Sequence, residues 1–224
     1  AAALAFFDMR QRIKRYIGQR SQLLAGVRHD LRTPLTALKL QLALLPPSPE
    51  IEDAKRDLAE MEETLDEYLA FAKGIAEEAP AEVVLSAVVE ELAAESRRSG
   101  GNVTIESAGS ARIPGRARAL KRCLANLIDN AIAHGDKVRV AVSNESEAVI
   151  VCVDDNGPGI PEELYEEAFR PFSRLDETRS RNQKGVGLGL AIARDVARSH
   201  GGDIKLSKSP LGGLRATLRL PRPP

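Results

Sequence analysis

The chain has 224 residues, with 32 lysines and arginines balanced by 32 aspartates and glutamates. This length suits one large domain or two small ones, and the lack of a basic excess argues against a nucleic-acid-binding protein. No apolar run approaches the roughly 18 residues that span a bilayer, so we expect no membrane contact within this chain.

The chain begins at Ala1, without an initiating methionine or a charged leader followed by a cleavage site. We therefore expect a fragment, with any membrane anchor or sensor of the parent protein lying upstream. Cys123 and Cys152 stand apart without metal-type spacing. They are interpreted as small buried apolar residues in a reducing compartment.

The first part of the chain carries only helix signals. Six apolar residues fall within a sector of roughly 60° around a helix; they are Leu24, Val27, Leu31, Leu38, Leu42 and Leu45. Residues 46–49 (Pro-Pro-Ser-Pro) cannot continue this helix. A second series, at alternating spacings of three and four, predicts a packed helical seam: Ile51, Ala54, Leu58, Met61, Leu65, Tyr68 and Ala72.

Two helices joined by a tight turn form a helical hairpin, and a hairpin alone buries its seams poorly. Two hairpins paired in a dimeric four-helix bundle solve this problem, so we predict a homodimer. We assign residues 23–74 to this region, and we assign the adjoining stretch 75–82, which is rich in small and acidic residues, to a linker.

Beyond the linker, the pattern changes to an α/β (α+β) sandwich, which we place over residues 83–221. The expected helices are Glu90–Arg98, Arg116–His134 and Leu188–His200. The expected strands are Asn102–Ser107, Lys137–Ser143, Ala148–Asp154, Asp203–Lys208 and Arg215–Leu220. We expect Lys137–Ser143 to pair with Ala148–Asp154, and Asp203–Lys208 to form a closing hairpin with Arg215–Leu220.

Two glycine-rich clusters point to phosphate and base binding. Residues 185–190 (Gly-Val-Gly-Leu-Gly-Leu) precede a predicted helix, so their backbone N–H groups can cradle a phosphate, although an ordinary turn explains such a cluster equally well. Residues 154–159 (Asp-Asp-Asn-Gly-Pro-Gly) follow a predicted strand. There Asp155 is a fixed acceptor suited to the exocyclic amine of adenine, and Gly157 and Gly159 let the backbone approach the base.

Asn126 and Asn130 lie four residues apart in the predicted helix 116–134, so they share one helix face. Amide oxygens can ligate Mg²⁺ that is held mainly by phosphates. Taken alone, however, the pair is better explained by local hydrogen bonding or capping.

Together, these three segments resemble the Bergerat-type nucleotide-binding domain shared by histidine kinases, gyrase, heat-shock chaperones and MutL. The resemblance covers roughly residues 83–220, and Phe169-Arg170-Pro171-Phe172 matches the phenylalanine box of the kinases. It implies that ATP and Mg²⁺ are the cofactors, that Asp155 reads adenine, and that Asn130 binds Mg²⁺ with support from Asn126. It also implies that the polar stretch between Ser173 and Lys184 is a lid over ATP.

The resemblance implies the following nucleotide-binding residues: Asn126, Asn130, His134, Asp155, Gly157, Gly159, Phe172, Arg179, Arg181, Lys184, Gly185, Gly187, Leu188 and Gly189. One position departs from the family. Many relatives carry a lysine or arginine where this chain has Ala133, and a missing cation there weakens phosphate binding unless Arg179, Arg181 or Lys184 replaces it.

His29 opens the run 29–36 (His-Asp-Leu-Arg-Thr-Pro-Leu-Thr) and lies roughly 165° from the centre of the apolar seam, so we expect it to face solvent. A lone surface histidine usually has no function. Here Thr33 shares its face, and Pro34 removes a backbone hydrogen bond and should bend the helix beside it. Such a break with local preference is typical of a functional site.

The run 29–36 resembles the H-box of the dimerisation and histidine-phosphotransfer domains of sensor histidine kinases, and 25–36 is most similar to the osmosensing EnvZ type. The resemblance implies that His29 accepts phosphate, that Asp30 orients its ring, and that Thr33 places water for dephosphorylating a partner response regulator. Residues 1–22 are assigned to a membrane-proximal signalling helix, because 6–22 resemble the exit helix of such a module. The chain is then the cytoplasmic portion of an inner-membrane sensor.

Two other functions compete with this interpretation. Gyrase-like and chaperone-like ATPases place a glutamate, which activates water, where this chain has Asn126, so a hydrolysing ATPase fits less well. A non-catalytic dimer scaffold fits less well too, because only the position of Ala133 departs from the motifs.

Overall fold

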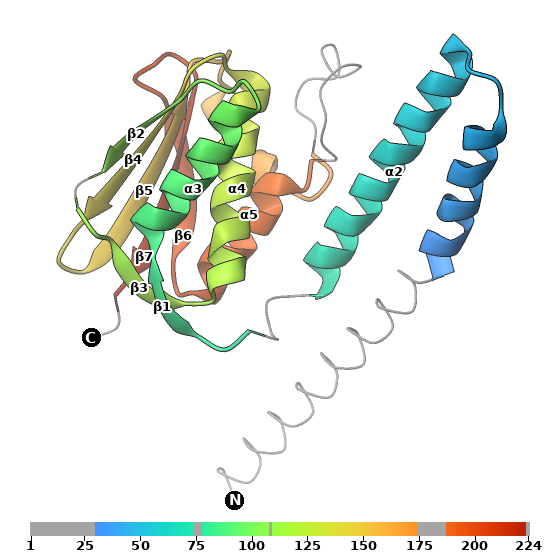
Figure 1. Cartoon of the computed structure of the whole chain (residues 1–224). Helices are drawn as coiled ribbons and strands as arrows, with labels where there is room; N and C mark the ends of the chain where they lie inside the picture. Colours follow the sequence, from blue (N-terminus) through green and yellow to red (C-terminus); the bar gives the residue numbers. More distant parts are fainter. Residues whose placement is uncertain (1–29, 74–77, 108, 174–186, 223–224) are drawn as a thin grey trace, which may run out of the picture. The chain divides into compact units, whose positions relative to one another are not determined.

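The structure is a computed structural model of the chain, and it describes residues 30–73, 78–107, 109–173 and 187–222. The chain divides into two compact units, one ending at Ala76 and the other beginning at Glu77 (Figure 1). Within the described ranges, no helix is both long enough and apolar enough to cross a bilayer.

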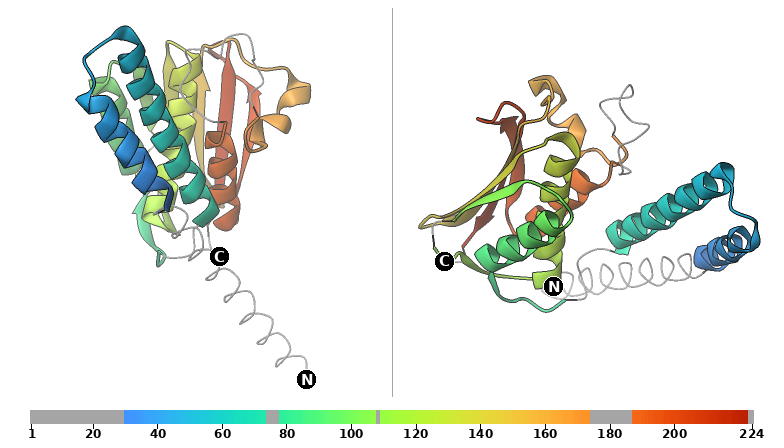
Figure 2. Two further views of the ribbon diagram at one scale, coloured as in Figure 1. Left: turned by 90° about the vertical axis from the view of Figure 1, so that its right-hand side faces the viewer. Right: turned by 45° about the horizontal axis from the view of Figure 1, so that its top comes forward.

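The described part of the first unit is a helical hairpin. A helix over 30–44 continues through Pro34 without a break, and α2 runs from Pro49 to Lys73 beside it (Figure 2). Lys39 Nζ joins Glu62 Oε2 across the two helices at 2.8 Å. Ser48 Oγ accepts the Ile51 N–H at 3.3 Å, so Ser48 caps α2 and Pro49 occupies its first position. The helix break predicted for 46–49 therefore lies at 45–48, one residue earlier and of the same length.

A single chain covers only part of the apolar stripe on the first helix. Leu35 and Leu42 are half-buried, whereas Leu31, Leu38 and Leu45 are 43%, 48% and 50% exposed. The three exposed leucines are seven residues apart, which places them along one line of the helix. This line is open in the isolated hairpin.

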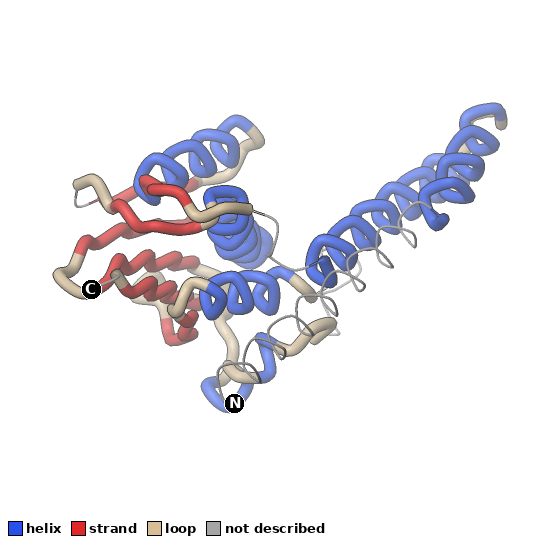
Figure 3. Tube along the Cα trace, turned by 90° about the horizontal axis from the view of Figure 1, so that it is seen from below, coloured by secondary structure: helices blue, strands red, loops and turns tan. Residues whose placement is uncertain are grey.

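The second unit is a two-layer sandwich whose main sheet has the strand order β2-β4-β5-β7-β6 (Figure 1). The strands are β2 (Val103–Ser107), β4 (Val138–Asn144), β5 (Ala148–Asp155), β6 (Asp203–Lys208) and β7 (Leu214–Pro221). One face of the sheet is covered by α3 (Leu85–Arg98), α4 (Ala117–His134) and α5 (Gly189–Ser199), as Figure 3 shows from below.

The core lies between this sheet and the three helices. Alternate strand residues point inward because successive side chains of a strand face opposite ways. Fully buried residues from strands and helices therefore meet there, including Val140, Val149, Val151, Leu218, Leu120, Leu124, Leu127, Val89 and Val196. Cys123 is also buried in this core, as predicted, whereas Cys152 is only half-buried.

The structure differs from the sequence analysis in three respects. Helix α3 begins at Leu85 rather than Glu90. β2 pairs in parallel with β4, a pairing that the sequence analysis did not assign, and the connection between them contains α4, the kind of crossover that a parallel pair needs. The third concerns β1 (Ala81–Val84) and β3 (Arg112–Gly115), which form a small antiparallel sheet that the sequence analysis did not predict. These strands have four residues each, too few to show a clear alternation.

Helix α4 obtains its N-terminal hydrogen bonds from distant residues. Its own N-cap residue, Arg116, makes no side-chain cap. Instead the Glu78 carboxylate accepts the Arg118 N–H at 3.1 Å, and His200 Nε2 accepts the Arg116 N–H at 3.1 Å. The other ring nitrogen, His200 Nδ1, lies 2.8 Å from the Val196 carbonyl oxygen, which can only accept. The ring must therefore carry its proton on Nδ1 and be neutral.

This neutral ring makes stability depend on pH. Burial lowers the pKa of His200 below its ordinary value of 6.5, more than the Val196 carbonyl raises it. The unfolded chain then binds a proton at His200 more readily than the folded chain, so the free energy of unfolding should fall as pH drops below about 6.5. Thermal unfolding of wild type and His200→Gln, followed from about pH 7 to about pH 5.5, should show a shallower decline for the variant. The exposed His134, changed to glutamine, is the control, and equal slopes for wild type and His200→Gln would contradict the assignment.

Candidate functional site

One face of α4 forms the floor of the candidate site. Asn126, Asn130 and His134 follow one another at four-residue intervals and therefore share this face. The Asn126 Nδ2 atom is buried and has no hydrogen-bond partner within the part of the chain that the structure describes. Leaving a buried polar atom unpaired costs about 1–3 kcal/mol, so this atom indicates a place for a polar ligand or an ordered water.

The glycine box lies against the Asn126 end of this face. A Cβ atom on Gly189 would stand 3.8 Å from the Asn126 Cβ, so the first residue of α5 packs beside the asparagine. α5 has no side-chain cap and no acidic residue in its first turn. Its first N–H groups can therefore bind an anion next to Asn126.

Phe172 meets the glycine box from the other side. Its N–H donates to the Gly187 carbonyl oxygen at 3.0 Å. Gly187 has φ +74°, and a Cβ there would stand 2.8 Å from the Ser173 carbonyl oxygen, so only glycine fits. Phe172 itself has φ 65° and a side chain that is 55% exposed. Backbone conformations of this kind cost a non-glycine residue about 1–3 kcal/mol and cluster at functional sites.

The opposite end of the α4 face meets the loop that follows β5. Asp155, the last residue of β5, is 3% exposed. Its Oδ1 atom accepts the N–H of Gly157 at 2.8 Å and the N–H of Leu214 at 3.1 Å. A Cβ on Gly157 would overlap the His134 carbonyl oxygen, so the loop packs directly on the end of α4. Both hydrogen bonds use Oδ1, so this oxygen is fixed by two backbone donors.

Asp154, the neighbouring residue, faces the other side of the sheet. Arg215 and Arg139 flank it, with Nε of Arg215 at 2.7 Å from Oδ1 and Arg139 at 3.1 Å from Oδ2. Burial raises the pKa of Asp154, but the hydrogen bonds from Arg215 and Arg139 more than offset this and hold it below its ordinary value. Asp154 thus forms ion pairs with arginines of β4 and β7, whereas Asp155 binds the loop after β5 and the start of β7.

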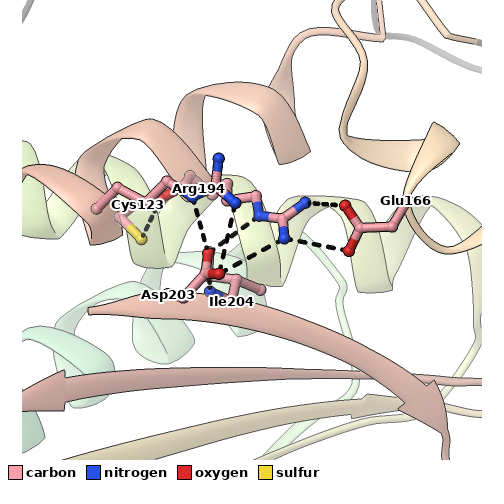
Figure 4. A network of polar contacts seen from close by, with 7 residues as sticks. Cys123, Glu166, Arg194, Asp203 and Ile204 are labelled. Atoms are coloured by element: carbon pink, nitrogen blue, oxygen red, sulfur yellow. Dashed lines mark hydrogen bonds and ion pairs between the residues drawn. The ribbon is translucent and has the colours of Figure 1, made fainter. Parts of the chain in front are cut away.

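Arg194 of α5 fixes the segment between the two glycine clusters (Figure 4). It holds Glu166 through two hydrogen bonds, at 2.7 and 3.1 Å, and Asp203 at 3.0 Å. Its guanidinium carbon lies 4.2 Å from the centre of the Phe169 ring. Burial raises the pKa of Asp203, but the hydrogen bonds from Arg194, the Ile204 N–H and Arg198 outweigh this effect and lower the pKa to about 2. The charged cluster is therefore permanent at neutral pH and anchors the phenylalanine box to α5.

The structure brings most of the predicted nucleotide-binding residues together. These are Asn126, Asn130 and His134 on α4, Asp155, Gly157 and Gly159 at the end of β5, and Phe172, Gly187, Leu188 and Gly189 around the start of α5. His29, Arg179, Arg181, Lys184 and Gly185 lie outside the described residues. Asp30 and Thr33 are exposed on the first helix of the hairpin.

No group of three or more histidine, cysteine, aspartate or glutamate side chains in the described ranges could hold a metal ion. One residue of the site was missed by the sequence analysis, namely Gly213, which packs against Asp155. Nothing local marks it, because a Gly-Gly pair between two strands also reads as an ordinary hairpin turn.

Two family descriptions match this chain. Residues 19–77 match the His Kinase A (phospho-acceptor) domain, and residues 115–224 match the histidine kinase-, DNA gyrase B- and HSP90-like ATPase. The sensor histidine kinase GtrS of Pseudomonas aeruginosa is 40% identical over 220 residues, which cover 98% of this chain and 46% of GtrS. The sensor histidine kinase CpxA of Escherichia coli is 33% identical over 233 residues, covering 99% and 51%.

Among solved structures, the ATP binding domain of PrrB from Mycobacterium tuberculosis is 30% identical, with a TM-score of 0.55. The match covers 65% of this chain and 98% of that domain. The chain therefore belongs to the sensor histidine kinases, with a phospho-acceptor helical region followed by an ATP-binding α/β sandwich. It spans about half the length of GtrS and CpxA (46% and 51%). The likeness of residues 25–36 to the EnvZ type stays a prediction.

The geometry around Asp155 predicts the effect of Asp155→Asn. The asparagine oxygen would take the two backbone N–H groups, so its NH₂ group would face the adenine amine, donor against donor. We expect nucleotide affinity to fall about 10- to 100-fold, roughly the 1.5–3 kcal/mol of a charge-assisted hydrogen bond. Calorimetric titration with ADP measures this, with Asp154→Asn as the matched control on the other face of the sheet. An unchanged dissociation constant for Asp155→Asn would rule out the role.

Proposed function

We propose that this chain is the catalytic core of a dimeric sensor histidine kinase, which transfers the γ-phosphate of ATP to His29 and then to an aspartate of a response regulator. The observation that carries the proposal is the unpaired Nδ2 of Asn126, a residue packed beside the start of α5, in a chain that also contains the H-box at 29–36. The first feature supplies a nucleotide site, and the second supplies a phosphate acceptor.

In this proposal, the base binds at one end of the α4 face and the phosphates bind at the other end. Asp155 accepts a hydrogen bond from the adenine amine at the His134 end, and the N–H groups at the start of α5 bind phosphates at the Asn126 end. Asn126 and His134 are eight residues apart, about 12 Å along the helix, so base and phosphates lie on one continuous surface. Asn130, between them, would hold Mg²⁺, which neutralises phosphate charge when bound.

Phosphate transfer requires a nucleophile and the absence of competing water. A lone pair on one ring nitrogen of His29 forms the new N–P bond, and the bond from the γ-phosphorus to the β–γ bridging oxygen breaks, releasing ADP. Asp30 accepts the proton of the other ring nitrogen and orients the imidazole. With asparagine at 126 rather than glutamate, the α4 face lacks a carboxylate there to activate water, so transfer is favoured over hydrolysis.

The open line of leucines on the first helix supports the homodimer. Leu31, Leu38 and Leu45 are each 43–50% exposed in a single chain, and burying them against the same residues of a second hairpin would complete a four-helix bundle. Such a pairing is symmetric, because the same line of side chains serves both partners.

A different face of the same helix suits the response regulator. Leu40 and Leu44 are 63% and 86% exposed. Leu40 is seven residues after Thr33, which places both on one face, and the predicted helix puts His29 one turn before Thr33. An apolar pair on the face of the phosphate acceptor, about 16 and 22 Å farther along the helix, offers a docking surface for the receiver domain that takes the phosphate.

We further propose the domain limits given by the sequence: a signalling helix at 1–22, the phosphotransfer region at 23–74, a linker at 75–82 and the ATP-binding domain at 83–221. The placement of this chain as the cytoplasmic portion of an inner-membrane sensor rests on the same resemblance.

His29→Gln tests the phosphate acceptor. Glutamine has no ring nucleophile, so incubation with γ-labelled ATP should leave the variant unlabelled, while its affinity for ADP stays at the wild-type value. The label on wild type should be lost in acid and kept in base, as expected for phosphohistidine. Wild-type labelling of His29→Gln would show that another residue is the acceptor.

Thr33→Ala separates the two activities of this face. Thr33 places a water for removing phosphate from the regulator, and its loss leaves helix propensity intact or improved. We expect near wild-type self-labelling, but a decay of purified phospho-regulator that is slower by about 10- to 100-fold. Equal decay with both proteins would make Thr33 a purely structural residue, and equal loss of both activities would show that it holds His29 in place.

Two substitutions on opposite faces of one helix test the interfaces. Leu38→Asp places a charge in the proposed bundle core, so the dimer should dissociate in light scattering, because an unpaired buried charge costs several kcal/mol. Leu40→Asp, two residues away, should leave the dimer intact and slow phosphate transfer to the regulator. A stable Leu38→Asp dimer would place the interface elsewhere.

A further inference from the structure

We propose that Gly213, in the turn between β6 and β7, is a positioning residue for adenine recognition. It acts through Asp155, whose carboxylate it lets approach the start of β7. The inference rests on the proposed nucleotide site and adds a segment, distant in sequence from the Asp155 loop and the glycine box, that sets the affinity for the adenine amine.

The turn that carries Gly213 is closed by its own hydrogen bonds. The Ser209 N–H donates to the Gly213 carbonyl oxygen at 2.8 Å, and the Gly212 N–H donates to the Ser209 carbonyl oxygen at 3.0 Å. The Ser209 Oγ atom accepts the Leu211 N–H at 3.0 Å, and Ser209 is only 3% exposed. Gly213 is therefore held in place by a buried serine, and its position is well defined.

Gly213 presses directly on Asp155. Its N–H donates to the Asp155 carbonyl oxygen at 3.2 Å, and the next N–H, of Leu214, donates to Asp155 Oδ1 at 3.1 Å. A Cβ atom on Gly213 would overlap Asp155 Oδ1 and would stand 2.5 Å from the Gly157 nitrogen, the other donor to Oδ1. Any side chain at 213 must therefore displace the carboxylate, its two donors, or both.

The two glycines of this turn differ in what they require. Gly212 has φ +109° with nothing within 4 Å of an added Cβ, so its glycine serves the backbone conformation. Gly213 is not in the left-handed region, so other residues could adopt its backbone conformation, but its surroundings leave no space. Glycine at 212 thus allows the backbone conformation of the turn, whereas glycine at 213 leaves room for the close contact with Asp155.

The consequence for recognition is chemical. Two backbone donors fix Oδ1, and this sets the direction of Oδ2 toward the exocyclic amine of adenine. If a methyl group at 213 tilts the carboxylate, the lost free energy is specifically that of the amine contact. The affinity for a purine without this amine should therefore not change with the substitution.

The experiment compares ADP with purine riboside 5′-diphosphate, which carries hydrogen in place of the amine, by calorimetry on the full chain. Wild type should bind ADP more tightly than the analogue. Gly213→Ala should weaken ADP binding by about 10-fold or more and leave the analogue almost unchanged, so that the preference for ADP disappears. Gly212→Ala, the matched control, should lower the unfolding temperature and keep the preference for ADP.

Ser209→Ala is the second variant, for use if Gly213→Ala does not fold. It removes the acceptor for the Leu211 N–H without adding bulk, so it should loosen the turn and reduce the preference for ADP to a smaller degree. Equal weakening of both ligands by Gly213→Ala, or an unchanged preference in a folded Ser209→Ala, would overturn the proposal. A wild-type chain that bound neither ligand, or bound both equally, would instead refute the adenine role of Asp155 itself.

Discussion

The buried carboxylate of Asp155 is the contact on which the proposed nucleotide site depends. A charge that is 3% exposed is costly unless hydrogen bonds compensate it, and here two backbone N–H groups converge on one of its oxygens. One donor belongs to the loop after β5, and the other to the start of β7. The carboxylate therefore joins two segments far apart in sequence, and the crowding at Gly157 and Gly213 follows from their close approach to it.

Helix α4 extends from the Asp155 loop to the start of α5, so the proposed site has two ends. Its C-terminal end is pressed against the Asp155 loop, and Asn126 lies against the first residue of α5. At its N-terminus the Arg118 and Arg116 N–H groups donate to Glu78, near the start of the second unit, and to His200, directly after α5. The helix is thus fixed at its start, along its length and at its end, as a surface that recognises a rigid ligand requires.

The sequence predicted the functional elements better than it predicted the fold around them. Helix α4, strand β5 and the start of α5 were placed correctly, because long amphipathic periods and glycine clusters at element boundaries are strong local signals. The parallel pairing of β2 with β4 and the small β1–β3 sheet were missed, because strand partners are chosen by long-range packing. Gly213 was missed for the same reason, since the space that excludes a side chain is created by Asp155, 58 residues earlier in the printed sequence.

Each of the two described units leaves a different kind of group without a partner: the hairpin exposes apolar side chains, and the sandwich buries an unpaired polar atom. The described hairpin leaves apolar side chains in water, and the hydrophobic effect favours covering them with another protein surface. In the described sandwich, the apolar core is closed, but the Asn126 amide is buried without a partner beside an uncapped helix N-terminus. Exposed apolar side chains are covered by a large macromolecule of matching shape, whereas an unpaired polar group in a confined place is suited to a small charged ligand. A chain that carries both features suits the proposed phosphate transfer, in which a nucleotide bound by the sandwich supplies the phosphate and His29 of the helical region accepts it.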